Sequence, residues 1–578
     1  MRSMTGISAV YRLAIDCETY LIGVGNQLPR VVCLQVYGLG IPARILRGDD
    51  ARATLEIALD DRTCILTGHN VAFDLGCCAL MWPSLSEAIF TAYERNGVIC
   101  TMAHAQLADF AIGVRGRSYA LDKVCERWHI SGCPDKGNAW RLRYGELDGV
   151  PTREWPTAAR EYALADVKCT FDLSQKLQLE APIPDVPAQS RWYYWLRLSS
   201  ALGMATDPQA VVDWEKELLA KVSAIEPYLL RAGLIDSTGK KRMAFLRDRM
   251  NQSGNARRTP KTEKGGGGNV IVDALACEES GDPLLQSFAR YNALRAAINR
   301  ELPMVKAPIV HTFYGMAATT RTTSSNPNMQ NLSTSSGSRK CFQPRAGMIY
   351  VIADYSILEL CCLAEMCLAL GVGDTLANVL IAGKDPHRSM AARLLGTDYD
   401  GAVEHSDYKR IRGRLAKEAN YGFPGGMGPA GLQRVAAKRG TALTLAQATS
   451  LKRQWAQQWP EIPRYQKRVS DELERNNGGA VEHYRTRHIR GGLSYTQACN
   501  SFFQALGAVV TKTAGWALTR AGALPSLFIH DEYVIEAPIA EAQDWAIEIK
   551  RICESTAKDI LEKVGCKCDP IINERWVK

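Results

Sequence analysis

Apolar runs that end directly in acidic residues restrict the fold of this chain more than any other feature. They occur over residues 11–18 (YRLAIDCE), 348–354 (MIYVIAD) and 527–532 (LFIHDE). Such runs are typical of buried β-strands, and side chains two residues apart on a strand point to the same face. Carboxylates held side by side repel one another unless a cation bridges them. The sequence therefore predicts sheets whose strand ends carry acidic sites.

Two later segments can complete the first acidic strand. Asp16 and Glu18 project together, although on their own they fit a solvated turn equally well. The segment 67–74 (TGHNVAFD) adds Asp74 after a turn, and 162–166 (YALAD) adds Tyr162 and Asp166 on one helix face. Four carboxylates can hold two Mg²⁺ ions about 3.5–4 Å apart, the arrangement for in-line attack on a phosphodiester. The tyrosine hydroxyl can orient the attacking water.

The other two acidic segments predict a second site. Asp354 ends the strand 348–354, and residues 527–537 are typical of a β-hairpin with His530 and Asp531 at its turn. Such a turn is ordinary by itself. A strand-end aspartate and a hairpin-tip aspartate can nevertheless share two Mg²⁺ ions, which activate a hydroxyl and hold a triphosphate with its leaving pyrophosphate.

Residues 408–422 (YKRIRGRLAKEANYG) predict a helix with one cationic and one apolar face. Spacings of 4, 3 and 4 place on the cationic face Arg410, Arg414, Lys417 and Tyr421. The apolar stripe consists of Ile411, Leu415 and Ala419. Cations followed by an aromatic ring suit a nucleotide, with charges for the phosphates and the ring beside the base or sugar. A basic face on an isolated helix is more often simply solvated, but the flanking acidic motifs favour the nucleotide.

Composition narrows the class of protein. The net charge of +9, from 70 basic and 61 acidic residues, favours a polyanionic partner without proving one. The 18 cysteines show no paired CxxC spacing, so we expect free, mostly buried thiols. No apolar run approaches the ~20 residues of a membrane span. Asp16 and Glu18 interrupt the first apolar segment, so we expect no secretion signal and no membrane partner.

A chain of 578 residues should divide into several domains. Residues 1–185 alternate strand-like and helical segments, and the proline-rich stretch 181–189 (APIPDVPAQ) is typical of a linker. Residues 190–335 are mainly helical, interrupted by a basic, glycine-rich loop at 256–269. Residues 336–578 mix strands and long helices. The expected fold class is α/β multidomain.

The motifs of the first 185 residues resemble those of the DEDD exonucleases of the tyrosine subtype. The match consists of Asp16 and Glu18, then Asn70, Phe73 and Asp74, then Tyr162 and Asp166. The resemblance implies an RNase H-like 3′-5′ exonuclease domain. It makes Asp16, Glu18, Asp74 and Asp166 the metal-binding catalytic acids and Tyr162 a catalytic residue.

The remaining residues resemble the polymerase I family (family A) of DNA polymerases. DYSxxEL (354–360) is similar to its motif A, KxxxYG (417–422) to motif B and HDE (530–532) to motif C. TTRTTSSNPNMQNL (319–332), DPH (385–387), NSFFQ (500–504) and the loop 259–275 fit as well. A right-hand polymerase is implied, with thumb and start of palm at 190–335 and palm and fingers at 336–578. The resemblance favours a role in DNA replication, with repair as the alternative that the sequence leaves open.

This resemblance also implies residue roles. Asp354 and Asp531 would bind the metal ions, with Glu532 an auxiliary acid at the primer end. Lys417 would contact the triphosphate and donate a proton to pyrophosphate, and Glu359 would exclude a 2′-hydroxyl. The nucleotide site would be completed by Tyr355, Arg414 and Tyr421. The residues implied to face primer or template are Arg321, Asn328, Gln330, Asn331, Asn500, Gln504 and His530.

The implied cofactor is Mg²⁺, two ions per active site, with Mn²⁺ as the alternative. The implied partners are primer–template DNA and dNTPs, while replisome or processivity factors stay unidentified. The exonuclease strand begins near residue 11 with no 5′-nuclease region before it. This compact layout resembles phage replicative polymerases more than bacterial repair enzymes. Such a protein would work in the cytoplasm of a bacterial host.

Several positions depart from the family pattern. Gly413 stands where an arginine is usual, and either Arg410 or Arg414 could replace it. Gly425 stands where a tyrosine usually supports the glutamate at 359, and Pro424 must end or kink the helix. Tyr421 stands where phenylalanine is common. In that respect the chain is similar to family members that accept 3′-deoxy sugars.

Three other classes compete with this reading. A single-subunit RNA polymerase shares a similar palm, but Glu359, HDE and the proofreading domain argue against it. A nuclease with an inert polymerase half is disfavoured by Asp354, Asp531 and Lys417. A noncatalytic DNA-binding protein would be expected to lose these acids, because unpaired acids cost stability.

Overall fold

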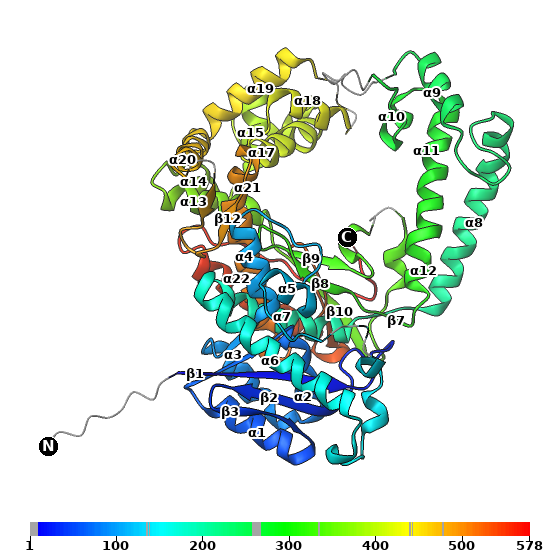
Figure 1. Ribbon diagram of the computed structural model, residues 1–578. Helices are drawn as coiled ribbons and strands as arrows, with labels where there is room; N and C mark the ends of the chain where they lie inside the picture. Colours follow the sequence, from blue (N-terminus) through cyan, green and yellow to red (C-terminus); the bar gives the residue numbers. More distant parts are fainter. Residues whose placement is uncertain are drawn as a thin grey trace.

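The computed structural model describes residues 10–577 except 135–136, 138, 257–267, 333–335, 439–440, 442 and 477–478. Figure 1 shows an N-terminal part in blue and cyan below a central part. Two helical arms rise from the centre on opposite sides. We call residues 208–296 (green) the first arm and residues 375–475 (yellow to orange) the second arm.

The N-terminal part is built on a mixed five-stranded sheet in the order β3-β2-β1-β4-β5. Its strands are β1 (Tyr11–Thr19), β2 (Val31–Gly38), β3 (Ile41–Leu46), β4 (Cys64–Gly68) and β5 (Val98–Cys100). β2 and β3 are antiparallel neighbours on one side of β1, and β4 and β5 run parallel to β1 on the other. Leu13, Ala14, Ile15 and Cys17 are buried in β1, as its apolar sequence predicts.

Helices cover both faces of this sheet. They are α1 (Gly48–Asp60), α2 (Val71–Met81), α3 (Ser86–Glu94), α4 (Thr101–Ala111), α5 (Leu121–Arg127) and α6 (Thr157–Glu180). The 24-residue helix α6 packs across β1, β2, β3 and β4. In Figure 1, α6 lies above the sheet and α1 below it. The core of this part is therefore a sheet between helical layers.

The central part holds an antiparallel sheet in the order β13-β14-β10-β15. Its strands are β10 (Met348–Asp354), β13 (Pro525–Ile529), β14 (Glu532–Pro538) and β15 (Ile571–Asn573). The predicted hairpin is confirmed, because β13 and β14 pair around His530 and Asp531. The long helices around this sheet are α13 (Leu358–Ala369), α21 (Tyr495–Arg520) and α22 (Ala542–Ile560). Small ladders join β6 (Met204–Ala205) to β7 (Ile309–Val310), and β8 (Phe313–Met316) to β9 (Thr322–Ser325).

Helix α7 (Val186–Leu202) packs against the N-terminal part and the central part at once. It contacts α2, α3, α4 and β5 on the N-terminal side, and β8, β13 and α21 on the central side. Trp192, Tyr194 and Trp195 of α7 are almost fully buried. The linker predicted over 181–189 is therefore wrong in its second half. The apolar and aromatic content of 186–202 makes the chain fold back as a core helix at once.

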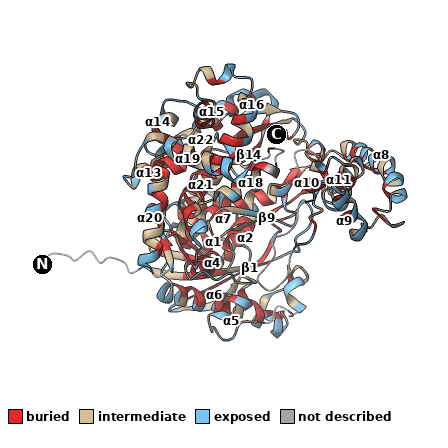
Figure 2. Cartoon of the chain, turned by 90° about the horizontal axis from the view of Figure 1, so that it is seen from above, coloured by how far each residue is buried: buried red, intermediate tan, exposed pale blue. Residues whose placement is uncertain are grey.

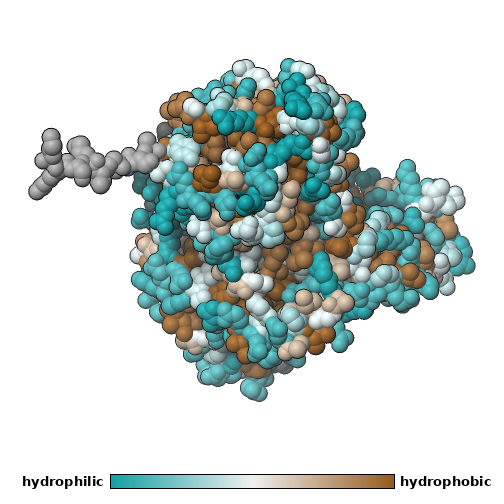
Figure 3. Space-filling view, turned by 90° about the horizontal axis from the view of Figure 1, so that it is seen from below, coloured by the Kyte–Doolittle hydropathy of each residue, from teal (hydrophilic) through white to brown (hydrophobic). Residues whose placement is uncertain are grey.

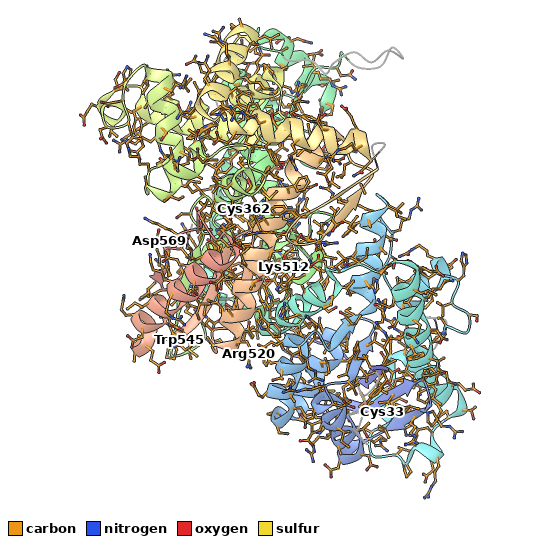
Figure 4. The ribbon with its side chains drawn as sticks, turned by 90° about the vertical axis from the view of Figure 1, so that its left-hand side faces the viewer. Cys33, Cys362, Lys512, Arg520, Trp545 and Asp569 are labelled. Atoms are coloured by element: carbon orange, nitrogen blue, oxygen red, sulfur yellow. The ribbon has the colours of Figure 1, made fainter. Side chains whose placement is uncertain are left out.

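Polar side chains reinforce this junction (Figure 4). The Lys512 ammonium of α21 donates to Gln189 Oε1 of α7 at 2.7 Å and lies 5.2 Å from the Trp192 ring. Arg520, near the end of α21, pairs with Glu87 at 2.7 Å and with Glu94 at 3.1 Å, both on α3. The two parts are thus joined by buried aromatic surface and by charged contacts.

The first arm consists of α8 (Pro208–Arg231), α9 (Met243–Gln252), α10 (Ala274–Glu279) and α11 (Pro283–Ala296). A π turn at Ala297–Glu301 and α12 (Leu302–Val305) follow it. Asp207 and Asp282 cap α8 and α11, each accepting two backbone N–H groups. The arm has its own small core, which includes Leu246, Leu285 and Phe288. Most of the predicted loop at 256–269 lies outside the described residues.

The second arm consists of α14 (Thr375–Ile381), α15 (Pro386–Leu395), α16 (Tyr408–Ile411), α17 (Lys417–Gly422), α18 (Pro429–Lys438), α19 (Leu445–Gln458) and α20 (Glu461–Arg475). A short hairpin of β11 (Ala480–Glu482) and β12 (Ile489–Gly491) follows. The buried Asn420 side chain ties three of these helices together. It accepts from the indoles of Trp455 and Trp459 at 3.1 and 3.0 Å and donates to Pro386 O at 3.1 Å.

Burial is greatest around α7, α13 and α21, whereas much of the first arm is exposed (Figure 2). Apolar residues lie scattered among hydrophilic ones on the face seen from below (Figure 3). Within the described residues, no helix combines the length and the apolar character that a membrane crossing requires. All 18 cysteines are free, and only Cys133 and Cys566 are not fully buried, as the sequence predicts.

Candidate active sites

The structure brings together the five residues predicted for the first site. They line a cavity of about 400 Å³, which we call the acidic cavity: Asp16, Glu18, Asp74, Tyr162 and Asp166. Carboxylate oxygens of Asp16, Glu18 and Asp166 all lie within 4.8 Å of one another. Three separate elements, β1, α2 and α6, therefore deliver acids to one place.

Local geometry explains how each acid reaches the acidic cavity. Asp16 and Glu18 are two residues apart on β1 and so share a face. Asn70 takes a left-handed conformation, φ 64°, immediately before α2, and this turns Asp74 in the first turn of α2 toward β1. Asp74 Oδ1 accepts the Cys17 backbone N–H at 3.1 Å. Tyr162 and Asp166 follow one another at i and i+4 on α6.

The electrostatics of the acidic cavity favour a cation. Burial raises the pKa of Glu18 well above its usual value, and the nearby Asp166 and Asp74 carboxylates raise it further. Burial also raises the pKa of Asp74 to about 7, against the opposing hydrogen bond from the Cys17 backbone. Charged carboxylates are costly in such a place unless a cation accompanies them. Oxygen ligands at this density fit a divalent metal ion such as Mg²⁺.

The acidic cavity also contains residues that motif reasoning missed. Arg141 lines it and lowers the pKa of Glu18, and Leu142 is 62% exposed beside it. Leu21 and Ile22 line it as well and are 61% and 49% exposed. The sequence could have indicated Leu21 and Ile22, because they directly follow the acidic strand. No periodic pattern surrounds Arg141.

A second and larger cavity, about 680 Å³, opens at the end of the central sheet. We call it the central cavity. Predicted residues that line it are Arg321, Asp354, Tyr355, Glu359, Lys417, Tyr421, His530 and Asp531. In the register of β10 and β14, Asp354 lies opposite Glu532, and Tyr355 N–H donates to Asp531 O at 3.4 Å. The strand end and the hairpin tip therefore place Asp354 and Asp531 at one site, as predicted.

Charged side chains face one another in the central cavity. Glu359 forms an ion pair with Arg321. Burial raises the pKa of Asp531, and the Glu359 carboxylate adds to this. Burial likewise raises the pKa of the Tyr421 hydroxyl, with further contributions from Glu359 and Asp531. The Tyr421 ring lies 5.3 Å from the buried His387 ring. Two carboxylates beside a lysine and an arginine can hold a divalent cation and a polyanion together.

Two predicted residues make their hydrogen bonds with groups outside the lining of the central cavity. Tyr355 borders it, but its ring is 2% exposed and its hydroxyl donates to Cys553 O at 2.8 Å in the core. Glu532 is not among the residues that line it, although it lies opposite Asp354 in the register of β10 and β14. Its Oε1 accepts from the Trp576 indole at 3.0 Å, and burial raises its pKa. The Tyr355 hydroxyl is therefore engaged in the core rather than at the predicted nucleotide site, and the role predicted for Glu532 stays a prediction.

Two of the residues predicted to face DNA, Arg321 and His530, line the central cavity, whereas the other five do not. Asn500 of α21 donates to Thr496 O at 2.8 Å and to Gly425 O at 3.4 Å, and Gln504 donates to Asn500. The exposed Asn328 caps the 3-10 turn η6 (Met329–Asn331), Gln330 donates to Thr322 O at 3.0 Å, and Asn331 is exposed. Sequence reasoning missed Gly507, Ala508 and Thr511, which line the cavity one and two turns beyond Gln504 on α21.

The prediction of one regular α-helix over 408–422 is wrong, because the helix contains a π turn. A π turn, η9 (Arg412–Ala416), separates α16 from α17, and Lys417 N–H donates to Arg412 O. Arg410 and Arg414 do not line the central cavity, and Arg410 pairs with Asp407 at 3.0 Å. The apolar stripe of Ile411, Leu415 and Ala419 is buried as predicted. The π turn keeps that stripe inside while shifting the polar residues before Lys417.

Several known proteins are similar to this chain. Residues 243–578, more than half of the chain, match the family model described as DNA polymerase family A. The chain is 28% identical over 270 residues to the DNA polymerase I of Aquifex aeolicus, covering 45% of each protein. It is 27% identical over 440 residues to the DNA polymerase I of Chloroflexus aurantiacus, covering 70% of this chain and 45% of that protein. The chain thus spans less than half the length of these relatives.

The fold is also similar to a solved structure, the POL domain of Pol1 from M. smegmatis in complex with DNA primer-template and dNTP. The TM-score is 0.73 at 18% sequence identity, and the alignment covers 99% of this chain and 96% of the other. The likeness in fold therefore extends over the N-terminal part as well.

Proposed function

Because the chain belongs to DNA polymerase family A, we propose that it is a template-directed DNA polymerase that extends the 3′ end of a primer with dNTPs. One observation carries the proposal: Asp354, Asp531, Lys417 and Tyr421 line a single cavity at the end of the central sheet. Carboxylates for metal ions, a cation for phosphates and a ring for the base or sugar are the groups that nucleotidyl transfer requires. The central sheet would be the palm, the first arm the thumb and the second arm the fingers.

Asp354 and Asp531 are the residues that would hold Mg²⁺, or Mn²⁺ in its place. Bound there, two divalent ions lower the pKa of the primer hydroxyl and offset the charge of the triphosphate and leaving pyrophosphate. Lys417 would bind the triphosphate and donate a proton to the leaving group. Glu359, held by Arg321 against the cavity wall, would occupy the space that a ribose 2′-hydroxyl needs. His530, Asn500 and Gln504 would contact primer and template.

We also propose that the acidic cavity is a 3′-5′ exonuclease site in an RNase H-like domain. Asp16, Glu18, Asp74 and Asp166 would hold the metal ions there, and the Tyr162 hydroxyl would orient the attacking water. Leu21, Ile22 and Leu142 are exposed apolar residues beside the acids. Apolar contacts of this kind suit the unstacked bases of a frayed 3′ end, which must enter as a single strand.

Primer extension on a recessed template with Mg²⁺ tests both assignments. The wild type should extend the primer with dNTPs and degrade it without them. Asp531→Ala should lose extension and keep degradation, whereas Asp16→Ala should do the reverse. If Asp531→Ala still extends the primer, or the wild type never does, the assignment of the central cavity is wrong. If Asp16→Ala still degrades the primer, the assignment of the acidic cavity is wrong.

A further inference from the structure

A third cavity, about 450 Å³, lies on the second arm and carries an excess of positive charge. We call it the cationic cavity. It is lined by Asp385, Arg388, Tyr399, Tyr408, Lys409 and Arg412. Three cations thus face one carboxylate within its lining. Fixed cations in a shared hollow recognise an anion with several oxygens, such as a phosphate group.

The π turn places the cationic cavity next to the proposed nucleotide site. In an α-helix the residue one turn before Lys417 is four positions back, which is Gly413. Here Lys417 N–H bonds instead to Arg412 O, five positions back. Arg412 therefore lies directly one turn before Lys417. A Cβ at Gly413 would meet no atom within 4 Å, so that position faces open space.

The start of α15 contacts lining residues of both the central cavity and the cationic cavity. Lys417 and Tyr421 line the central cavity, and Arg412 lines the cationic cavity. His387, in the first turn of α15, interacts with residues of both cavities. Its ring is 5.3 Å from the Tyr421 ring, and its pKa, lowered to about 4 chiefly by burial, is lowered further by the charges of Arg412 and Lys417. One extended anion could therefore contact Tyr421, Lys417 and Arg412 in that order.

Asp385 holds the Arg412 guanidinium in place and occupies one side of it. Arg412 Nε donates to Asp385 Oδ2 at 2.7 Å, and Nη2 lies 2.6 Å from the same oxygen in an ion pair. Asp385 Oδ1 accepts the His387 backbone N–H at 2.8 Å, which fixes the carboxylate at the start of α15. A guanidinium has five N–H groups. The N–H groups on the side turned from Asp385 can donate to phosphate oxygens, in an orientation set before the ligand arrives.

We propose that Arg412 binds the terminal phosphate of the nucleoside triphosphate whose sugar and base lie against Tyr421 in the central cavity. This proposal rests on the polymerase function proposed above. Arg412 takes this role instead of Arg410 and Arg414, which line neither cavity. Because of the π turn, the cation one turn before Lys417 is Arg412 rather than a residue at position 413.

The test compares ligands that differ only in the terminal phosphate. The protein is bound to a primer–template whose primer ends in a dideoxynucleotide, so that no reaction follows. Dissociation constants are then measured for the complementary dNTP and for the corresponding dNDP. We expect Arg412→Ala to reduce the preference for the triphosphate about tenfold or more, because one charge-assisted phosphate contact is lost. Arg412→Lys should keep part of the preference, since it retains the charge without the planar fork.

Arg410→Ala is the matched control, because it removes a cation from the same segment outside both cavities. It should keep the wild-type preference. In extension assays, Arg412→Ala should raise the KM for dNTPs more than it lowers kcat, and an unchanged unfolding midpoint identifies a folded variant. A wild type that neither extends primers nor binds dNTP would refute the polymerase function itself. A wild type that does both, while folded Arg412→Ala keeps its full preference for the triphosphate, overturns only the role of Arg412.

Discussion

Arg321 and Glu359 form an ion pair in the central cavity, joining the segment before β9 to the first turn of α13. Family members usually have a tyrosine, at the position of Gly425, that supports this glutamate. Here a Cβ at Gly425 would come within 2.6 Å of the Asn500 amide, so no side chain fits without movement. The contact that the Glu359 carboxylate makes here is the ion pair with Arg321.

This pairing predicts how the enzyme discriminates against ribonucleotides. Glu359→Ala should raise rNTP incorporation relative to dNTP about tenfold or more, because the space for the 2′-hydroxyl opens. Arg321→Ala should raise it less, and the double variant should match Glu359→Ala, since the two residues act through one contact. Competitive primer extension with rNTP and dNTP measures the ratio. Arg551→Ala, on the exposed face of α22, is the control. Additive effects would contradict the coupling.

Tyr421 predicts ready incorporation of dideoxynucleotides. Its hydroxyl lies close enough to Glu359 and Asp531 for their charges to raise its pKa. A hydroxyl there can replace the polar contact that a nucleotide loses with its 3′-hydroxyl. Tyr421→Phe should therefore lower the ratio of ddNTP to dNTP incorporation at least about tenfold, as when a site's hydrogen-bonding group is removed. Chain termination on a sequencing ladder reports the ratio, and an equal ratio in both proteins would refute the role of the hydroxyl.

Arg141 should matter for exonuclease activity and not for extension. It lines the acidic cavity beside Glu18, where a guanidinium can contact the phosphate that is cleaved. Arg141→Ala should lower the rate of single-strand degradation by about tenfold to a hundredfold. Arg143→Ala is the matched control, because Arg143 is exposed and paired with Glu146 at 2.6 Å. Equal loss in both variants would indicate a general effect of charge near residue 140.

Lys512 predicts a pH dependence of stability. Burial lowers its pKa to about 7. The unfolded chain keeps this proton up to about pH 10 whereas the folded protein loses it above about pH 7, so the free energy of unfolding rises across that window. Burial raises the pKa of Asp185 to about 7, so its contribution to the free energy of unfolding decreases as the pH rises. This contribution is confined to the range between about pH 4 and 7. His488 also faces this group, and burial lowers its pKa to about 4, so it stays neutral here.

Urea unfolding followed by tryptophan fluorescence measures this effect, because the Trp192 ring lies 5.2 Å from Lys512. Between about pH 7.5 and 9.5 the wild type should gain on the order of 1–3 kcal/mol relative to Lys512→Met. Parallel profiles for the two proteins would show that Lys512 is charged over the whole range.

The periodicity of strands and helices was enough to predict which site residues share a face within one segment. Asp16 and Glu18 share a face because strand side chains alternate, and Tyr162 and Asp166 share one because helix residues four apart are neighbours. The hairpin around Asp531 followed from its pattern in the same way. Each of these features depends only on the conformation of one short segment, and the sequence of that segment determines it.

The features that sequence reasoning missed depend on tertiary packing. The π turn before Lys417 arises where α16 and α17 pack against α15, and no spacing in 408–422 signals it. The motif around Tyr355 places a tyrosine beside an acid without indicating that its ring enters the core. Arg141 reaches the acidic cavity from a segment without periodicity. The predicted linker 181–189 is cut short at Val186, where α7 begins, because the aromatic side chains of α7 pack against other parts of the fold.

Helix α7 has a consequence for anyone who wishes to dissect this protein. Its tryptophans and tyrosines are covered by the N-terminal part on one side and by the central part on the other. Expressing either part alone would leave a strip of aromatic surface bare, and such strips cause association and precipitation. Fragments cut at residue 185 are therefore poor reagents. Single substitutions in the intact chain are the sounder way to obtain one activity without the other.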